Sequence, residues 1–168
     1  LFFSAFSIGD NPWRIPPREV IHQVWEAVEE YYNDERVINI KSATKKWNEN
    51  TFLFDTYALL EILNKNMNYE KFTETGIVIN DFIFAELCFK LFREGVNAND
   101  YIAEVSPAII HAAPKIIIRA MLFRVDNKDK NLSMADCISY IQAKELGIKF
   151  LTGDKQFENL ENVEFVKK

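Results

Sequence analysis

The sequence has little of what several common functional sites require. Its 168 residues include only 5 glycines, 2 histidines and 2 cysteines. The glycines are scattered, so there is no Walker loop and no G-x-G-x-x-G fingerprint. His22 and His111 have no Cys or His partner at zinc-like spacing, so we interpret each as a structural or surface residue. The sequence also has no nucleophile-elbow motif, so nothing in it supports a Ser-His-Asp hydrolase.

The scarcity of cysteine and of long apolar runs indicates in which cellular compartment the protein is located. Cys88 and Cys137 are too few for a disulfide framework, and both lie in apolar, helix-like runs. We interpret them as small core residues in a reducing environment, and we predict a cytoplasmic location. The apolar stretches fall far short of the ~20 residues that cross a bilayer, so no membrane association is expected. Residues 1–6 are apolar but lack the basic lead-in of a signal peptide.

Composition changes near residue 48. All three tryptophans and three of the five prolines precede it. We therefore predict an N-terminal extension over residues 1–48 and a main domain over residues 49–168. Within the extension, apolar residues at three- and four-residue steps predict an amphipathic helix over residues 18–36. Residues 37–40 are typical of a short strand.

From residue 51 onward, strand-like and helix-like segments alternate. Short apolar runs predict strands at residues 51–54, 77–79, 148–151 and 163–166, with a minor one at 109–110. Helices are predicted after the first strand and at residues 69–75, 80–93, 98–104, 114–125 and 133–146. Strands separated by helices of this length predict an α/β domain with a parallel sheet.

Four acidic residues stand close to the ends of these strands or to the starts of the helices: Asp55, Glu86, Asp136 and Asp154. Because parallel strands end at one edge of a sheet, the four can converge there on a metal ion. Simpler interpretations remain open for three of them. Asp55 can cap its helix, Asp136 can belong to a capping box with Ser133, and Asp154 can be a turn residue. Glu86 lies in an almost wholly apolar run, where an ionised carboxylate needs a cationic partner.

The sequences around these acids resemble the motifs of PIN-domain ribonucleases. The four matching segments are residues 54–60 (FDTYALL), 85–87 (AEL), 132–138 (LSMADCI) and 151–157 (LTGDKQF). They occur in the family's order and at family-like spacing over about residues 51–166. The size of the domain and the form of its motifs most resemble the VapC-like toxins of bacterial and archaeal toxin–antitoxin pairs.

The resemblance implies a three-layer α/β/α domain that hydrolyses RNA phosphodiester bonds. It assigns Asp55, Glu86, Asp136 and Asp154 as ligands of Mg²⁺ or Mn²⁺, and the hydroxyls of Thr56 and Thr152 as orienting groups. Hard oxygen ligands suit these cations. The resemblance further implies an RNA substrate, an antitoxin protein as partner and a homodimer.

The net charge of −5 at first argues against a nucleic-acid-binding protein. Residues 51–168, however, hold 14 Lys and Arg against 17 Asp and Glu. If four of those acids face a divalent cation, the remaining charges are nearly balanced. Lys128, Lys130 and Lys155 lie close in sequence to Asp136 and Asp154, so we regard them either as contacts for the RNA backbone or as ordinary surface lysines.

The sequence leaves open the role of the extension and the activity of the domain. The extension is expected to pack on its own domain, to mediate dimerisation, or to dock like an antitoxin segment with Arg14 or Arg18 reaching the acids. The function has two alternatives to a ribonuclease. One is a PIN-like fold that only binds RNA or protein. The other is a haloacid-dehalogenase-like phosphatase, which Tyr57 opposes because that family needs an Asp at this place.

Overall fold

The computed structural model describes residue 26 and residues 47–167. Its strands are β1 (Thr51–Phe54), β2 (Gly76–Val78), β3 (Lys149–Thr152) and β4 (Val163–Phe165). Its α-helices are α3 (Thr56–Leu63), α4 (Asp81–Arg93), α5 (Asn99–Val105), α6 (Pro114–Asp126) and α7 (Met134–Leu146). Short 3₁₀ helices are η1 (Met67–Phe72), η2 (Ser106–Ala108), η3 (Lys128–Lys130) and η4 (Lys155–Phe157). The predicted extension lies outside the described residues, apart from Glu26, which is helical, and its last two residues, Trp47 and Asn48.

The four strands form one parallel sheet in the order β2-β1-β3-β4. β1 lies in the middle, with Leu53 opposite Val78 on one side and opposite Phe150 on the other. This confirms the parallel sheet expected from the alternation of strands and helices. It also brings the carboxyl ends of β1 and β3 next to each other.

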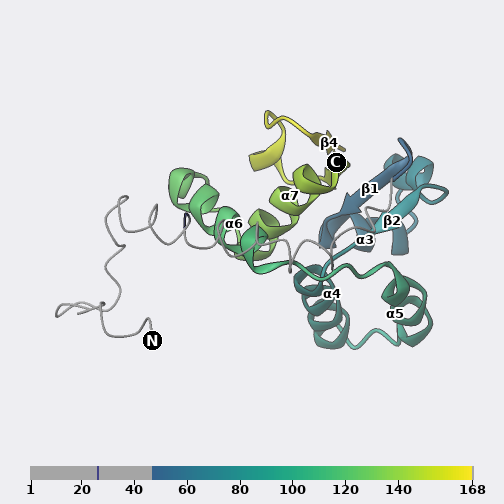
Figure 1. Cartoon of the computed structure of the whole chain (residues 1–168). Coiled ribbons are helices and arrows are strands. Elements are labelled where there is room, and N and C mark those ends of the chain that lie inside the picture. The colour runs from purple at the N-terminus through teal and green to yellow at the C-terminus, as the bar shows by residue number, and fades with distance from the viewer. Residues whose placement is uncertain (1–25, 27–46, 168) are drawn as a thin grey trace, which may run out of the picture. The chain divides into compact units, whose positions relative to one another are not determined.

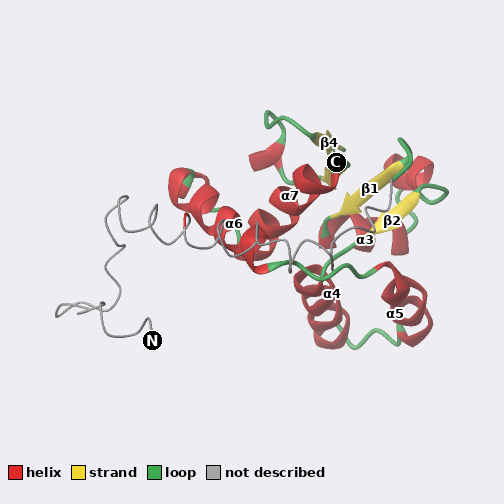
Figure 2. Cartoon of the chain, viewed as in Figure 1, coloured by secondary structure: helices red, strands yellow, loops and turns green. Residues whose placement is uncertain are grey.

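Helices cover both faces of the sheet, as Figures 1 and 2 show. Side chains alternate along β1 and β3, so Leu53 and Phe150 belong to one buried cluster, and Phe54 and Leu151 to the other. The Leu53 cluster is completed by α6 and α7, and the Phe54 cluster by α3, η1, α4 and α5. The predicted three-layer α/β/α arrangement is therefore confirmed.

The helices near the sheet edge begin at residues whose side chains cap them. The Asn80 side chain accepts from the backbone N–H groups of Phe82 and Ile83 at the start of α4. The Ser133 side chain accepts from the Asp136 N–H at the start of α7. These caps satisfy donors that the first turn of a helix leaves unpaired. They also fix where the turns that carry the acids begin.

Two predicted elements differ from the structure. Residues 69–75 do not form an α-helix, because the chain makes the 3₁₀ helix η1 over Met67–Phe72 and Gly76 already belongs to β2. Asn66 begins η1 by accepting from the Asn68 N–H, which starts the turn earlier than expected. The minor strand expected at residues 109–110 is a single parallel bridge between Ile79 and Ile109.

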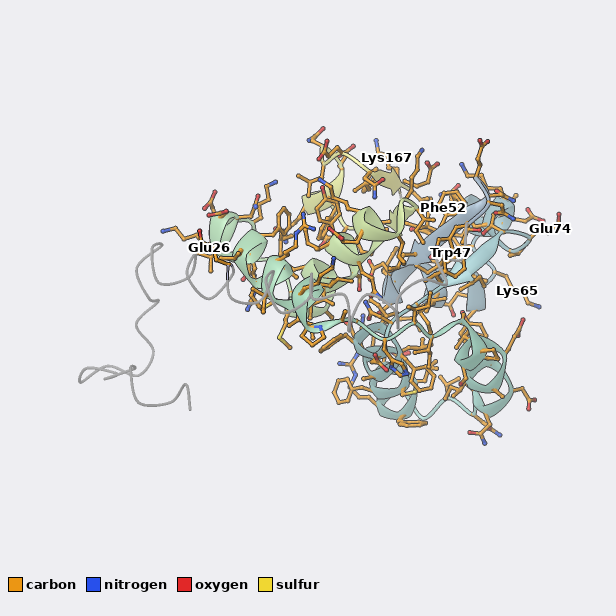
Figure 3. All side chains as sticks on the ribbon, in the orientation of Figure 1. Glu26, Trp47, Phe52, Lys65, Glu74 and Lys167 are labelled. Carbon is orange, nitrogen blue, oxygen red and sulfur yellow. The ribbon has the colours of Figure 1, made fainter. Side chains whose placement is uncertain are left out.

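Lys65 and Glu74 are exposed and point into solvent (Figure 3). Cys88 and Cys137 are both free thiols. Cys137 is buried in the core, as predicted, whereas Cys88 is only half-buried. Within the described part of the chain, no helix is both long enough and apolar enough to cross a membrane.

Candidate active site

The predicted acids do gather at the carboxyl edge of the sheet. Asp55 follows β1 directly, and Asp154 follows β3 after Gly153. Asp136 lies in the first turn of α7, while Glu86 lies in the second turn of α4. Since β1 and β3 are adjacent and parallel, their ends deliver Asp55 and Asp154 to the same edge.

Asp55 is the most buried of the four, with 5% of its surface exposed. Its Oδ2 accepts a 2.7 Å hydrogen bond from the Thr152 hydroxyl. Its Oδ1 caps α3 through a longer 3.4 Å contact with the Tyr57 N–H. Burial raises the pKa of Asp55 to about 7, and the negative charges of Asp136 and Glu86 contribute to the rise. Asp55 is therefore both a helix cap and a member of a cluster of like charges.

Glu86 is half-buried, and both of its carboxylate oxygens are engaged. The Thr56 hydroxyl donates to Oε2 at 2.9 Å, and the Lys90 ammonium contacts Oε1 at 3.0 Å. The cationic partner that the apolar surroundings of Glu86 demanded is thus Lys90, one helical turn further along α4. The i,i+4 spacing of Glu and Lys was the signal in the sequence that could have identified it.

Asp136 takes part in the capping of α7 and also belongs to the acid cluster. Its backbone N–H donates to the Ser133 hydroxyl oxygen at 3.1 Å, and that hydroxyl donates to Asp136 Oδ2 at 2.5 Å. In a standard capping box the acid would instead reach the backbone N–H of the cap residue. Burial raises the pKa of Asp136, and the charges of Glu86 and Asp154 raise it further.

Thr152 joins the ends of the two central strands. Besides donating to Asp55, its hydroxyl accepts a 3.1 Å hydrogen bond from the Asp154 N–H. Asp154 Oδ1 in turn accepts from the Gln156 N–H at 2.9 Å, which makes Asp154 the cap of η4. The turn interpretation of Asp154 is therefore correct, and the same turn holds its carboxylate beside the other acids.

The four carboxylates interact electrostatically, but their side chains are not arranged to coordinate a metal ion. Asp136 interacts electrostatically with each of the other three acids. Among the residues described, no three His, Cys, Asp or Glu side chains are placed so that they could hold a metal ion. The donor chemistry nevertheless suits a hard cation, because the cluster offers carboxylate and hydroxyl oxygens. Metal binding by these residues stays a prediction.

A buried polar network beneath the cluster was not anticipated from the sequence. The Asn80 amide donates to Ser139 Oγ at 2.9 Å and to Gln142 Oε1 at 3.0 Å. Gln142 Nε2 then donates to the carbonyl oxygens of Ile110 and His111. Asn80, Ser139 and Gln142 are all at most 1% exposed. The network ties the start of α4 to α7, and so links the helices that carry Glu86 and Asp136.

Gly153 lies against two tyrosines. A Cβ atom at this position would lie 2.7 Å from both Tyr57 Cε1 and the Tyr69 hydroxyl. The Tyr69 hydroxyl is buried without a hydrogen-bond partner in residues 47–167. The turn between Thr152 and Asp154 therefore packs tightly against aromatic rings, which only glycine permits.

The three lysines considered as RNA contacts differ in exposure. Lys128 and Lys155 are exposed, whereas Lys130 is half-buried. Lys128 and Lys130 lie in η3, directly before the loop that leads to Ser133 and Asp136. Their place next to the cluster along the chain is compatible with either interpretation.

Comparison with known proteins identifies a family. The family model for the PIN domain matches residues 52–163. No curated protein matches the chain significantly.

Solved structures show the same fold at low sequence identity. A toxin–antitoxin complex from Klebsiella pneumoniae contains a chain with 19% identity and a TM-score of 0.56, covering 67% of this chain and 95% of that one. The Sarcin-Ricin loop cleaving toxin VapC20 of Mycobacterium tuberculosis has 17% identity and a TM-score of 0.58, covering 68% and 98%. A protein from Pyrobaculum aerophilum has 17% identity and a TM-score of 0.54, covering 69% and 89%. At these identities the likeness concerns the fold alone.

Proposed function

The chain belongs to the PIN domain family, and on that premise we propose that it is a metal-dependent endoribonuclease that acts as the toxin of a toxin–antitoxin pair. The observation that carries the proposal is the gathering of Asp55, Glu86, Asp136 and Asp154 at one sheet edge, where their charges interact. A fold gains nothing from clustering like charges, and such clusters are typical of functional sites.

The proposed cofactor is Mg²⁺ or Mn²⁺, held by the four carboxylates. When bound, such a cation supplies a water of lowered pKa and positive charge against the phosphodiester. The raised pKa values of Asp55 and Asp136 support this assignment, since a divalent cation favours the ionised form of both carboxyl groups.

The threonines of the site position the carboxylates. The Thr152 hydroxyl holds Asp55 Oδ2, and the Thr56 hydroxyl holds Glu86 Oε2. Each bond restricts the rotation of a carboxylate and leaves its remaining lone pairs for a cation. Such supporting hydrogen bonds tune ligand orientation in metal sites.

The substrate and partners follow from the same proposal. RNA is the substrate, with Lys128, Lys130 and Lys155 as candidate contacts for its backbone. An antitoxin protein is the proposed partner, in line with the toxin–antitoxin complex among the structural relatives. We also propose a homodimer and a cytoplasmic location, and a role for residues 1–48 as a separate extension.

One observation favours a non-catalytic PIN-like domain that binds RNA or protein. Lys90 already neutralises Glu86, and residues 47–167 contain no ready set of three metal-binding side chains. The two candidates differ in a simple respect. A nuclease must cleave RNA when Mn²⁺ is added, whereas a binding domain must not.

The test is cleavage of total RNA by the full chain as Mn²⁺ is titrated, with EDTA as the blank. We expect cleavage with Mn²⁺, none with EDTA and none for Asp55→Asn, whose circular dichroism should match the wild type. Asp129→Asn is the matched control, because it makes the same acid-to-amide change at an exposed position in η3. Equal cleavage by wild type and Asp55→Asn would sink the assignment, and no cleavage by either would favour the binding domain.

A further inference from the structure

We propose that Lys90 is an RNA-binding residue of the active site, whose ammonium contacts a phosphate of the strand being cleaved. This inference rests on the proposed function. It adds a substrate contact on α4 to the four acids and two threonines already assigned.

The first support is position. Glu86 and Lys90 are four residues apart on α4 and therefore share one face of the helix. The Lys90 Nζ lies 3.0 Å from Glu86 Oε1, with 29% of its side chain exposed. The ammonium is thus held beside one member of the acid cluster, on a side chain that is partly open to solvent.

The second support is charge. Four carboxylates at one edge repel a phosphate, so a polyanionic substrate needs fixed cations close to them. In the described part of the chain, Lys90 is the sole Lys, Arg or His side chain in an ion pair with any of the four acids. Lys155, although next to Asp154 in sequence, is exposed.

The third support is hydrogen-bonding capacity. A lysine ammonium has three donors, and the contact with Glu86 uses one of them. The other two can reach phosphate oxygens, to which lysine binds as a point charge. A partly exposed i,i+4 ion pair contributes little to the free energy of unfolding, so the pairing with Glu86 leaves the Lys90 ammonium available to a phosphate.

The inference predicts opposite effects on metal and RNA binding. Lys90→Gln removes a positive charge next to the proposed metal ligand Glu86, so Mn²⁺ should bind at least as tightly as to the wild type. The same variant loses a phosphate contact. RNA should then bind about five- to tenfold more weakly, and the slope of log K against log salt should be smaller by about 1. Loss of a lysine with only a structural role would not weaken RNA binding while leaving Mn²⁺ binding unchanged or tighter.

The experiment uses the full chain and three variants. Mn²⁺ affinity is measured by calorimetry, and RNA affinity by anisotropy of a fluorescein-labelled single-stranded RNA of mixed sequence in EDTA. Lys90→Arg retains the charge and should keep RNA affinity within about threefold of wild type. Lys149→Gln is the matched control, because Lys149 pairs with Glu164 at 2.9 Å, outside the cluster. It should leave both affinities and cleavage unchanged.

The outcomes are distinct. Weaker RNA binding and slower cleavage by Lys90→Gln, with unchanged or tighter Mn²⁺ binding, support the proposal. Unchanged RNA affinity in Lys90→Gln, or an equal loss in Lys90→Arg or Lys149→Gln, overturns it while leaving a nuclease in place. A wild-type chain that neither binds nor cleaves RNA overturns the proposed function, and this inference with it.

Discussion

The hydroxyl of Thr152 donates a 2.7 Å hydrogen bond to Asp55 across 97 positions of sequence. It joins the ends of β1 and β3, two strands that are neighbours in the sheet. Through this bond the backbone of the sheet sets the orientation of the most buried acid of the site.

Replacing Asp55 should stabilise the protein in the absence of metal. Its pKa is about 7 in the folded chain against an ordinary 3.8, so the fold favours the protonated acid. As pH rises from about 4 to about 7, ionisation of this group costs the wild type stability, and above that range the loss is complete. Asp55→Asn keeps a good helix cap and has no charge to lose. In EDTA at pH 8 its free energy of unfolding should exceed that of wild type by an amount on the order of a few kcal/mol.

Urea denaturation in EDTA between pH 4.5 and 8.5 measures this difference. The advantage of Asp55→Asn should be small at pH 4.5, grow with pH and level off above about 7. The exposed control Asp129→Asn should show no such growth. A variant that is less stable than wild type at every pH would contradict the account of this carboxyl group.

Removing the Thr152 hydroxyl should weaken both the fold and metal binding. Thr152→Val leaves the Asp154 N–H without its acceptor and removes the donor to Asp55. The expected loss is about 1–3 kcal/mol of unfolding free energy, with about tenfold weaker Mn²⁺ binding. Thr152→Ser retains the hydroxyl and should keep Mn²⁺ affinity within about twofold of wild type. Equal Mn²⁺ affinities of Thr152→Val and Thr152→Ser would show that the Thr152 hydroxyl has no part in metal binding.

Most of the elements could be read from the sequence because their signals are local. Asn80 and Ser133 mark helix starts, and the apolar runs of the strands are short and clearly bounded. The short helix expected at residues 69–75 is a 3₁₀ helix over Met67–Phe72, because the Asn66 cap starts the turn earlier. The acids were predicted from their places near strand ends and helix starts, together with the motifs around them. Asp55, Asp136 and Asp154 cap or begin elements as the simpler interpretation held, and they also cluster.

The contacts that shape the site are not local, and this is why the sequence did not predict them. The amide of Asn80 meets Ser139 and Gln142 about 60 residues away, at a distance that no periodicity encodes. Nothing near Gly153 in the sequence indicates that Tyr69 packs against it. The Glu86–Lys90 ion pair is local and was not predicted either, although its i,i+4 spacing could have identified it.

The network around Asn80 should be worth more than a helix cap. Asn80→Ala removes the cap of α4 and leaves buried acceptors on Ser139 and Gln142 without their donor. The expected loss is roughly 2–4 kcal/mol. Asn80→Asp should be no better, because it restores the cap but places a carboxylate against the Gln142 oxygen. Asn66→Ala removes a cap and a part-buried hydrogen bond to Glu61 but no buried network, and it should cost less, about 1–2 kcal/mol. Thermal and urea unfolding measure all three, and a fully stable Asn80→Asp would contradict this view of the network.

The packing of Gly153 predicts a coupled pair of substitutions. Gly153→Ala places a methyl group against Tyr57 and the Tyr69 hydroxyl, which should cost about 1–3 kcal/mol. Tyr69→Phe removes the hydroxyl that lacks a partner and should raise stability by about 1 kcal/mol.

The double variant should recover part of the Gly153→Ala loss, with a coupling above about 0.5 kcal/mol in a double-mutant cycle. Tyr101→Phe is the control, because its hydroxyl donates to the Leu59 carbonyl at 2.8 Å. It should lower stability and show no coupling to Gly153→Ala. If the changes in unfolding free energy of Tyr69→Phe and Gly153→Ala were strictly additive, the Tyr69 hydroxyl would not be in steric contact with residue 153.

The central claim is that Asp55, Glu86, Asp136 and Asp154 together hold the divalent cation of a ribonuclease. Its most direct test is a crystal of the full chain soaked in Mn²⁺ and measured at the manganese absorption edge. We expect an anomalous peak within about 2.5 Å of carboxylate oxygens from at least two of these four residues, and no such peak in Asp55→Asn. Manganese bound elsewhere, or nowhere, in crystals of an active wild-type protein would contradict it.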